Sequence, residues 1–243
     1  MKKVSPEQPA RTRVTKDPQE RREELLDIAW ELGRNQGFEA LRVEQIVQTA
    51  GIAKGTFYHY FAAKDDVVEA LVQRFGDGLF AELSQAAAQL GTADERLRRI
   101  MTAATAYKLS HSDFSYASFL YREENRPIRQ RLFRAWQQRA RDVLLPVITA
   151  GADDGSFDIG DAETTTDLVL LLWFDAADHL WLRATSAADA DTFADIMFRG
   201  GAAIYQAQER ILGMAPKSFT VPTDPAVTDL IKELYRTLDR NPS

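Results

Sequence analysis

Apolar residues recur every three to four positions over most of this chain, which is the spacing of one face of an α-helix. Between residues 21 and 36 they fall at Leu25, Ile28, Ala29 and Leu32, and later segments keep the same period. No stretch predicts a β-strand. The pattern therefore predicts an all-α protein, with helices at residues 21–36, 43–50, 54–61, 65–90, 95–110, 114–124, 127–151, 161–184, 189–212 and 226–238.

Two of these predicted helices are short and meet at a tight turn. The first has four apolar residues on one face, the turn begins at Gly51, and the second helix turns Phe57 and Phe61 inward. Two helices joined by a turn of three or four residues that contains Gly form a helix-turn-helix, whose second helix enters the major groove of DNA. The sequence therefore predicts a DNA-binding motif.

The residues around the second helix fit a contact with DNA. No Asp or Glu lies between Gln45 and Lys64. Gly55 allows a close backbone approach, and the neighbouring hydroxyl groups and free N–H groups can bind phosphate. The alternative is a pair of ordinary packed helices with a polar surface. The residues expected to contact DNA are Arg42, Gln45, Lys54, Gly55, Thr56, Tyr58, His59, Tyr60 and Lys64.

Residues 21–71 resemble the N-terminal domain of the tetracycline-repressor-like (TetR) family of transcription regulators. The matching residues are Gly37-Phe38, the run AGIAKGTFYHYF from Ala50 to Phe61, and Lys64. Two positions depart from the family pattern. Arg42 stands where the family has a capping Ser or Thr, which predicts a helix start weaker by about 0.5–2 kcal/mol unless Arg42 contacts phosphate itself. Ala53 replaces a common Ser.

The net charge of −6 is distributed unevenly along the chain. Residues 1–75 contain as many Lys and Arg as Asp and Glu, so residues 76–243 carry the whole excess. Residues 1–22 are basic. Because non-specific DNA binding depends mostly on phosphate electrostatics, this distribution predicts specific binding with weak affinity elsewhere. The arm either lies along DNA or has no role.

Several classes of protein are disfavoured by composition. There is no Cys, so neither a disulfide framework nor a thiolate metal site is expected. The apolar run 168–174 is far shorter than the roughly 20 residues of a membrane-spanning helix, and the N-terminus lacks the apolar core of a signal peptide. We expect a cytoplasmic protein without a membrane partner. Asp175, Asp178 and His179 share helical spacing but lack the second His of a zinc site, so we expect no metal and no cofactor.

The middle of the chain is rich in aromatic residues. These residues either line a cavity that holds a small molecule or fill a closed core. The family resemblance implies a ligand there, and the residue types favour a lipophilic or aromatic effector. The residues expected in this pocket are Ala104, Tyr107, Lys108, Tyr116, Phe119, Trp136, Trp173 and His179.

Two adjacent glycines, Gly200 and Gly201, lie inside a predicted helix. Each costs about 1 kcal/mol relative to Ala, a cost that close approach of another helix would offset. The resemblance implies that the helices at 161–184 and 189–212 pair with their copies in a homodimer. The alternative is a buried intramolecular helix that ends at Gly200. The expected interface residues are Trp181, Ile196, Met197, Gly200, Gly201 and Ile204.

These observations combine into one interpretation. We expect a basic arm at 1–20, a three-helix DNA-binding domain at 21–71, a helical ligand-binding and dimerisation domain at 72–215 and a C-terminal extension with a short helix at 216–243. The long helix at 65–90 joins the two domains. The expected function is that of a homodimeric repressor, not an enzyme, released from a palindromic operator by an effector. The alternative is a constitutive DNA-binding regulator without an effector.

Overall fold

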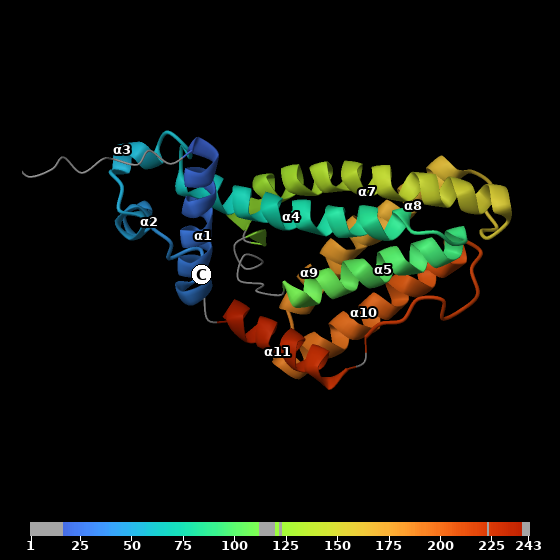
Figure 1. The fold of residues 1–243 in the computed structure, drawn as a ribbon. Helices are drawn as coiled ribbons and strands as arrows, with labels where there is room; N and C mark the ends of the chain where they lie inside the picture. The colour runs from blue at the N-terminus through green and yellow to red at the C-terminus, as the bar shows by residue number, and fades with distance from the viewer. Residues whose placement is uncertain (1–16, 112–119, 122, 223, 240–243) are drawn as a thin grey trace, which may run out of the picture.

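The computed structural model describes residues 17–111, 120–121, 123–222 and 224–239, and all secondary structure in these ranges is helical. The order of elements is α1 (Pro18–Gln36), α2 (Val43–Ala50), α3 (Lys54–Phe57), α4 (Lys64–Ala88), α5 (Ala93–Ser110), η1 (Glu123–Asn125), α7 (Arg126–Asp154), α8 (Ala162–Leu171), η2 (Leu172–Ala176), α9 (Ala177–Thr185), α10 (Ala190–Ile211) and α11 (Pro225–Asp239). Helices α1–α3 gather at one end of the molecule, and the remaining helices extend away from them (Figure 1). The prediction of an all-α chain is confirmed.

Helix α1 begins three residues before the predicted position. The carboxylate of Asp17 accepts hydrogen bonds from the backbone N–H groups of Gln19 (2.8 Å) and Glu20 (3.4 Å). Pro18 occupies the first helical position, where no backbone N–H is needed. Because of this cap, residues 18–20, which were predicted to belong to the arm, are part of α1. Residues 1–16 of that arm lie outside the described residues.

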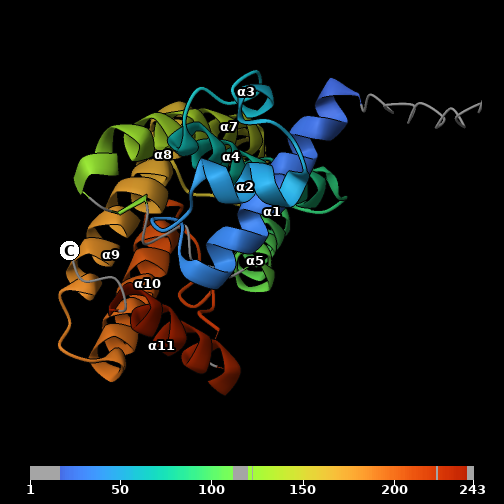
Figure 2. The same cartoon turned by 90° about the vertical axis from the view of Figure 1, so that its left-hand side faces the viewer.

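Helix α4 belongs to two hydrophobic cores at once. Its N-terminal half packs with α1, α2 and α3, and also with the beginning of α7. Its C-terminal half packs with α5 and α7, which lie on either side of it (Figures 1 and 2). The buried residues of α4 in the first core are Val67, Val68, Ala70, Leu71 and Val72.

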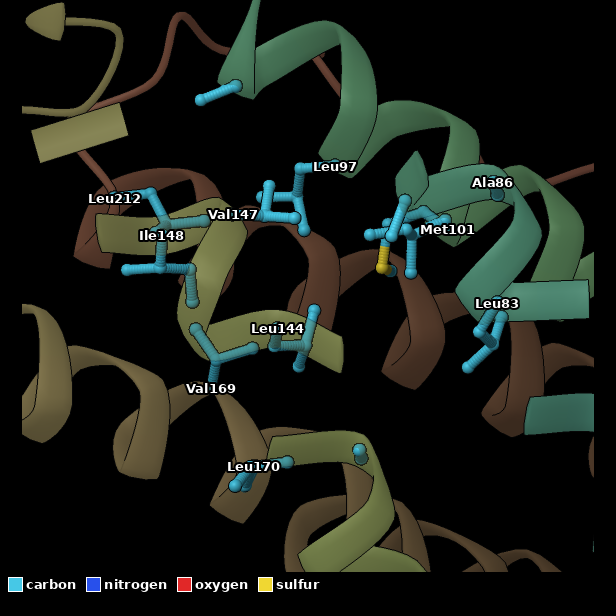
Figure 3. Close-up of a cluster of buried hydrophobic side chains, with 14 of the residues drawn as sticks. Leu83, Ala86, Leu97, Met101, Leu144, Val147, Ile148, Val169, Leu170 and Leu212 are labelled. Carbon is cyan, nitrogen blue, oxygen red and sulfur yellow. The ribbon is translucent and has the colours of Figure 1, made fainter. Parts of the chain in front are cut away.

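The larger core lies among α4, α5, α7, α8 and the end of α10. Leu97, Ile100, Leu144 and Ile148 are all exposed by 1% or less, so this region is closely packed. Figure 3 shows these helices turning Leu, Val and Ile side chains toward one another. A third, smaller core joins α9, α10 and α11 around Trp181 and Phe193.

The structure corrects two predictions of local structure and leaves a third untested. The helix predicted at 161–184 contains a π-helical turn, η2, between α8 and α9. The residues there are apolar nearly all round, so their pattern gives no sign of a change in winding. Pro146 lies within α7, which continues to Asp154, beyond the predicted end at Gly151. The helix predicted at 114–124 falls mostly outside the described residues.

A buried carboxylate organises the segment between α10 and α11. Glu209 is only 3% exposed, and its two oxygens accept hydrogen bonds from the backbone N–H groups of Lys217 (3.0 Å) and Phe219 (2.8 Å). This arrangement holds Phe219 in the larger core. Among the described helices, none combines the length and hydropathy needed to cross a membrane.

Candidate nucleic-acid interface and internal cavity

The turn between α2 and α3 is formed by a left-handed residue. Gly51 has φ 64° and ψ 34°, a conformation that costs glycine nothing sterically. The N–H of Ile52 donates to the carbonyl of Val47 (3.0 Å), which satisfies the end of α2 and redirects the chain. The predicted helix-turn-helix is therefore present.

Helix α3 is shorter than the predicted 54–61. Its α-helical part ends at Phe57, and the N–H groups of His59 and Tyr60 bond to carbonyls three residues back, at 3.3 and 2.9 Å. Such tightening is common where a helix ends. Phe57 and Phe61 remain buried as predicted, at 0% and 3% exposure.

The outer surface of α3 is open. Lys54, Gly55, Tyr58 and His59 are exposed, and α3 lies at the outer edge of the molecule in both views (Figures 1 and 2). A Cβ atom added at Gly55 would meet nothing within 4 Å. Packing inside this chain therefore does not require glycine at position 55. Thr56 and Tyr60 are half-buried at the edges of the same surface.

Lys54 has an acidic partner that the sequence analysis did not anticipate. Its ammonium donates to the carboxylate of Glu44 on α2 at 2.5 Å. This hydrogen bond holds the pKa of Glu44 below its usual value and raises the pKa of Lys54. Both groups face solvent, so exchanging Glu44 for a phosphate would cost little.

Gln45 caps the N-terminus of α2, because the side chain of Arg42 has no oxygen that could accept a hydrogen bond. Its side-chain oxygen accepts from the backbone N–H of Arg42 (3.0 Å), and its amide exchanges hydrogen bonds of 3.0 and 3.1 Å with Gln36 on α1. Gln45, the third residue of α2, therefore compensates for the weaker helix start that was predicted at Arg42. The side chain of Arg42 itself is exposed.

Lys64 also makes an internal contact. Its ammonium donates to the carbonyl of Glu39 at 3.1 Å, which joins the start of α4 to the loop between α1 and α2. Nearby, the guanidinium of Arg22 lies 5.1 Å from the centre of the Phe61 ring. The second contact joins α1 to Phe61, which lies between α3 and α4.

A cavity of about 370 Å³ lies beside the larger core. This volume is near the lower end of the roughly 300–1,000 Å³ that hold small ligands. Its walls come from α4, α5, α7, η2, α9 and α10, with Tyr121 and Val221 completing the lining. The wider winding of η2 brings three consecutive residues, Leu172, Trp173 and Phe174, to one wall.

Two charged residues stand among the described lining residues, Lys108 on α5 and Asp178 on α9. Asp178 faces Arg129 of α7, with 3.5 Å between its carboxylate and the Nε of that side chain. Burial and the nearby Asp178 raise the pKa of Tyr121. Lys108 makes no hydrogen bond or ion pair with any residue that the structure describes, and desolvation lowers its pKa.

Comparisons with known proteins identify the family. Residues 25–71 match the family described as "Bacterial regulatory proteins, tetR family". The transcriptional repressor KstR2 of Rhodococcus jostii is 31% identical over 140 residues, which cover 56% of this chain and 68% of that protein. KstR2 of Mycobacterium tuberculosis is 30% identical over 150 residues, which cover 60% and 73%.

The chain belongs to the tetR family. It is a DNA-binding transcription regulator and not an enzyme. A transcriptional regulator from Cytophaga hutchinsonii shares the fold, with a TM-score of 0.61 at 15% identity over 78% of this chain and 97% of that one. The resemblance stated from the sequence is thereby confirmed.

The structure brings together only some of the pocket residues predicted for this tetR-family chain. Ala104, Lys108, Trp136 and Trp173 lie in the cavity lining. Tyr107 lies outside it, where its ring stacks on His111 with 4.0 Å between the centroids. His179 is exposed, and its Nδ1 lies 2.9 Å from the carbonyl oxygen of Asp175. Tyr116 and Phe119 lie outside the described residues.

Sequence reasoning missed the contribution of α4 to the cavity. Phe75, Leu79, Phe80 and Leu83 line it, yet their helical spacing is the same as that of ordinary core residues. Phe133 on α7 was also missed, although it lies three residues from Trp136 and its ring is 6.0 Å from that of Trp136.

The residues predicted at a dimer interface make contacts within the chain. A Cβ atom at Gly200 would lie 2.2 Å from Leu180, so the close helix approach at this glycine is made by α9 of the same chain. Gly200 does not end α10, which continues to Ile211. Trp181 is buried against Phe193, with Ile196 and Met197 beside them. Met197, Gly201 and Ile204 also line the cavity.

Proposed function

We propose that this chain is a homodimeric repressor whose hold on DNA is released by a small molecule in the cavity. The observation that carries the proposal is the continuity of α4. Val68 and Leu71 lie in the core of the DNA-binding helices, while Phe75 and Phe80, further along the same helix, face the cavity. A ligand that favours one position of α4 would therefore change the position of α3. The KstR2 relatives are named repressors, which supports the sign of regulation.

The proposed DNA contact places α3 in the major groove. Tyr58, His59 and Gly55 would face base edges, while Lys54, Thr56, Tyr60 and Arg42 would contact phosphates. Lys64 and Gln45 would act by positioning the motif as well as by any direct contact. A two-fold dimer would present two such helices about 34–36 Å apart to a palindromic operator. The domains predicted at 21–71 and 72–215 would meet within α4, and the DNA partner implies action in the cytoplasm.

The proposed dimer contact uses the exposed stripe of α8 and α9. Leu168, Leu171 and Leu182 are 43%, 52% and 43% exposed, an unusual exposure for large apolar side chains. Asp175 and His179 lie between them along the same stripe. Pairing with a second copy would bury these leucines and complete a four-helix contact with α10.

Ion pairs on the surface also connect α4 with its neighbours, and they would help to couple the cavity to the DNA-binding helices. Arg131 and Arg139 of α7 pair with Glu69 and Asp77 of α4 at 2.8 and 2.5 Å. Arg74 of α4 pairs with α1. Exposed pairs contribute little stability, but these connect α4 on both sides to the elements it must move with.

The test is to fill the cavity without touching the DNA surface. Ala104→Trp places a large ring in the lining, so it should abolish operator release by any effector while leaving operator affinity unchanged. Ala106→Trp, on the exposed side of the same helix, is the matched control and should respond to the effector as the wild type does. Fluorescence anisotropy of operator DNA, enriched from the host genome, measures both properties.

Two results would reject the proposal. If Ala104→Trp is released as readily as the wild type, the effector acts elsewhere. If no lipophilic compound weakens operator binding or shifts the melting temperature of the wild type, the constitutive alternative holds. Linkage requires that a releasing ligand lose affinity for the DNA-bound protein by the same factor that it reduces DNA affinity.

A further inference from the structure

We propose that the cavity binds an amphipathic anion, with an apolar body against the aromatic walls and one carboxylate or similar acidic group held by Lys108. The inference deepens the proposed function, because it names the chemical class of the effector. It rests on the placement of charge and of hydrogen-bond donors around the cavity.

The cavity carries one cation that nothing in its described lining balances. Its two charged lining residues differ in their surroundings, because Asp178 has Arg129 beside it at 3.5 Å while Lys108 has no acidic partner among the described residues. The wall that α4 contributes is entirely apolar. Lys108 is exposed and lines the cavity, so its ammonium can bind a group that enters there. A hydrogen bond from an ammonium to an anionic ligand is stronger than one to a neutral ligand.

Two further groups of the lining are buried donors without acceptors. The indole Nε1 of Trp173 and the amide Nε2 of Gln208 have no hydrogen-bond partner. These two groups can only donate a hydrogen bond, so what they lack is a ligand oxygen. The Oδ1 of Asp178 is also without a hydrogen-bond partner, but it lies 3.5 Å from the Nε of Arg129. Buried polar groups in native proteins are almost always satisfied. By contrast, the Thr105 and Tyr205 hydroxyls of the lining already bond to each other at 3.2 Å.

The remaining walls fix the rest of the ligand. Aromatic and aliphatic side chains dominate them, which suits a hydrocarbon or ring body and excludes a highly polar molecule such as a sugar. The volume of about 370 Å³ limits that body to a modest size. The lining aromatic residues are Phe75, Phe80, Tyr121, Phe133, Trp136, Trp173, Phe174 and Tyr205.

The experiment compares acids with their neutral analogues. Pyrenebutyric acid and pyrenebutanol share one aromatic body, and dodecanoic acid and dodecanol share one aliphatic body. Binding to the full-length protein without DNA is measured by pyrene fluorescence and by calorimetry at neutral pH, where both acids are ionised. The variants are Lys108→Met, which keeps length but removes charge, and Lys108→Arg, which keeps charge. Lys232→Met on α11, outside the lining, is the matched control.

We expect the wild type to bind at least one acid about 10- to 100-fold more tightly than its alcohol, the effect of a charge-assisted hydrogen bond. Lys108→Met should reduce acid affinity to the level of the alcohol and leave the alcohol unchanged. Lys108→Arg should retain a preference for the acid, and Lys232→Met should match the wild type. If Lys108→Met does not fold, the acid and alcohol affinities of the wild type decide by themselves.

Three results would overturn the proposal: equal affinity of the wild type for acid and alcohol, an acid preference that persists in Lys108→Met, or failure of both acids to bind. Operator release is measured separately. Acids that bind through Lys108 without releasing DNA would refute the effector role and keep the anion site. Release of operator DNA by neutral compounds, independent of Lys108, would keep the effector role of the cavity and refute the anion site.

Discussion

Replacing Gln45 by alanine should destabilise the DNA-binding domain by about 1.5 kcal/mol. The side chain caps α2 through the N–H of Arg42 at 3.0 Å, a contact worth about 1 kcal/mol. It also makes two hydrogen bonds with Gln36, which are exposed and therefore near the lower limit of about 0.5 kcal/mol each. The higher helix propensity of alanine returns a few tenths of a kcal/mol, which leaves about 1.5 kcal/mol.

The assay is urea unfolding followed by circular dichroism, at one protein concentration because a dimer's stability depends on concentration. Gln45→Glu is the matched variant. Its carboxylate can still accept from the Arg42 N–H, so most of the capping energy should remain, whereas DNA affinity should fall because a negative charge is added near the proposed DNA surface. A loss below about 0.5 kcal/mol for Gln45→Ala would refute the capping argument. Unchanged DNA affinity in Gln45→Glu would place position 45 away from DNA.

Four other substitutions test the proposed surfaces. Gly55→Leu should leave the melting temperature unchanged, since a side chain there meets open space, but should abolish operator binding; Gly160→Leu, also in open space, serves as the control. Lys64→Ala should weaken binding to all DNA sequences about equally, whereas Tyr58→Ala should also change sequence preference in a panel of operator variants. Leu171→Glu should yield a folded monomer in sedimentation, and a stable dimer in that variant would place the interface elsewhere.

The helices and the binding motif could be predicted from the sequence because their determinants are local. Apolar spacing within α2 and the glycine at position 51 depend only on neighbouring residues, and both predictions agree with the structure. The family resemblance rests on one contiguous run, Ala50 to Phe61, which needs no tertiary information. Local reasoning missed two helix caps: Asp17, which starts α1 three residues earlier than predicted, and Gln45, which compensates for the missing capping oxygen at Arg42.

Pairings between distant residues were decided only by the tertiary structure. Glu44 lies just outside the segment that lacks acids, yet it reaches Lys54 because the turn at Gly51 folds α3 back toward α2. Gly200 was predicted to lie at a dimer contact, and only the folded chain shows that Leu180 of α9 packs against it.

The cavity shows the limit of sequence reasoning most clearly. Ala104 and Trp136 could be anticipated from an aromatic-rich segment, but Phe80 could not, because a core residue and a cavity-lining residue have the same helical spacing. Lys108 was predicted to lie in the pocket, but only the packing of six helical elements around the cavity places it beside an apolar space without a described partner. Periodicity reports which face of a helix turns inward. Whether that face meets side chains or an empty volume depends on how several helices pack together, and no single segment encodes that packing.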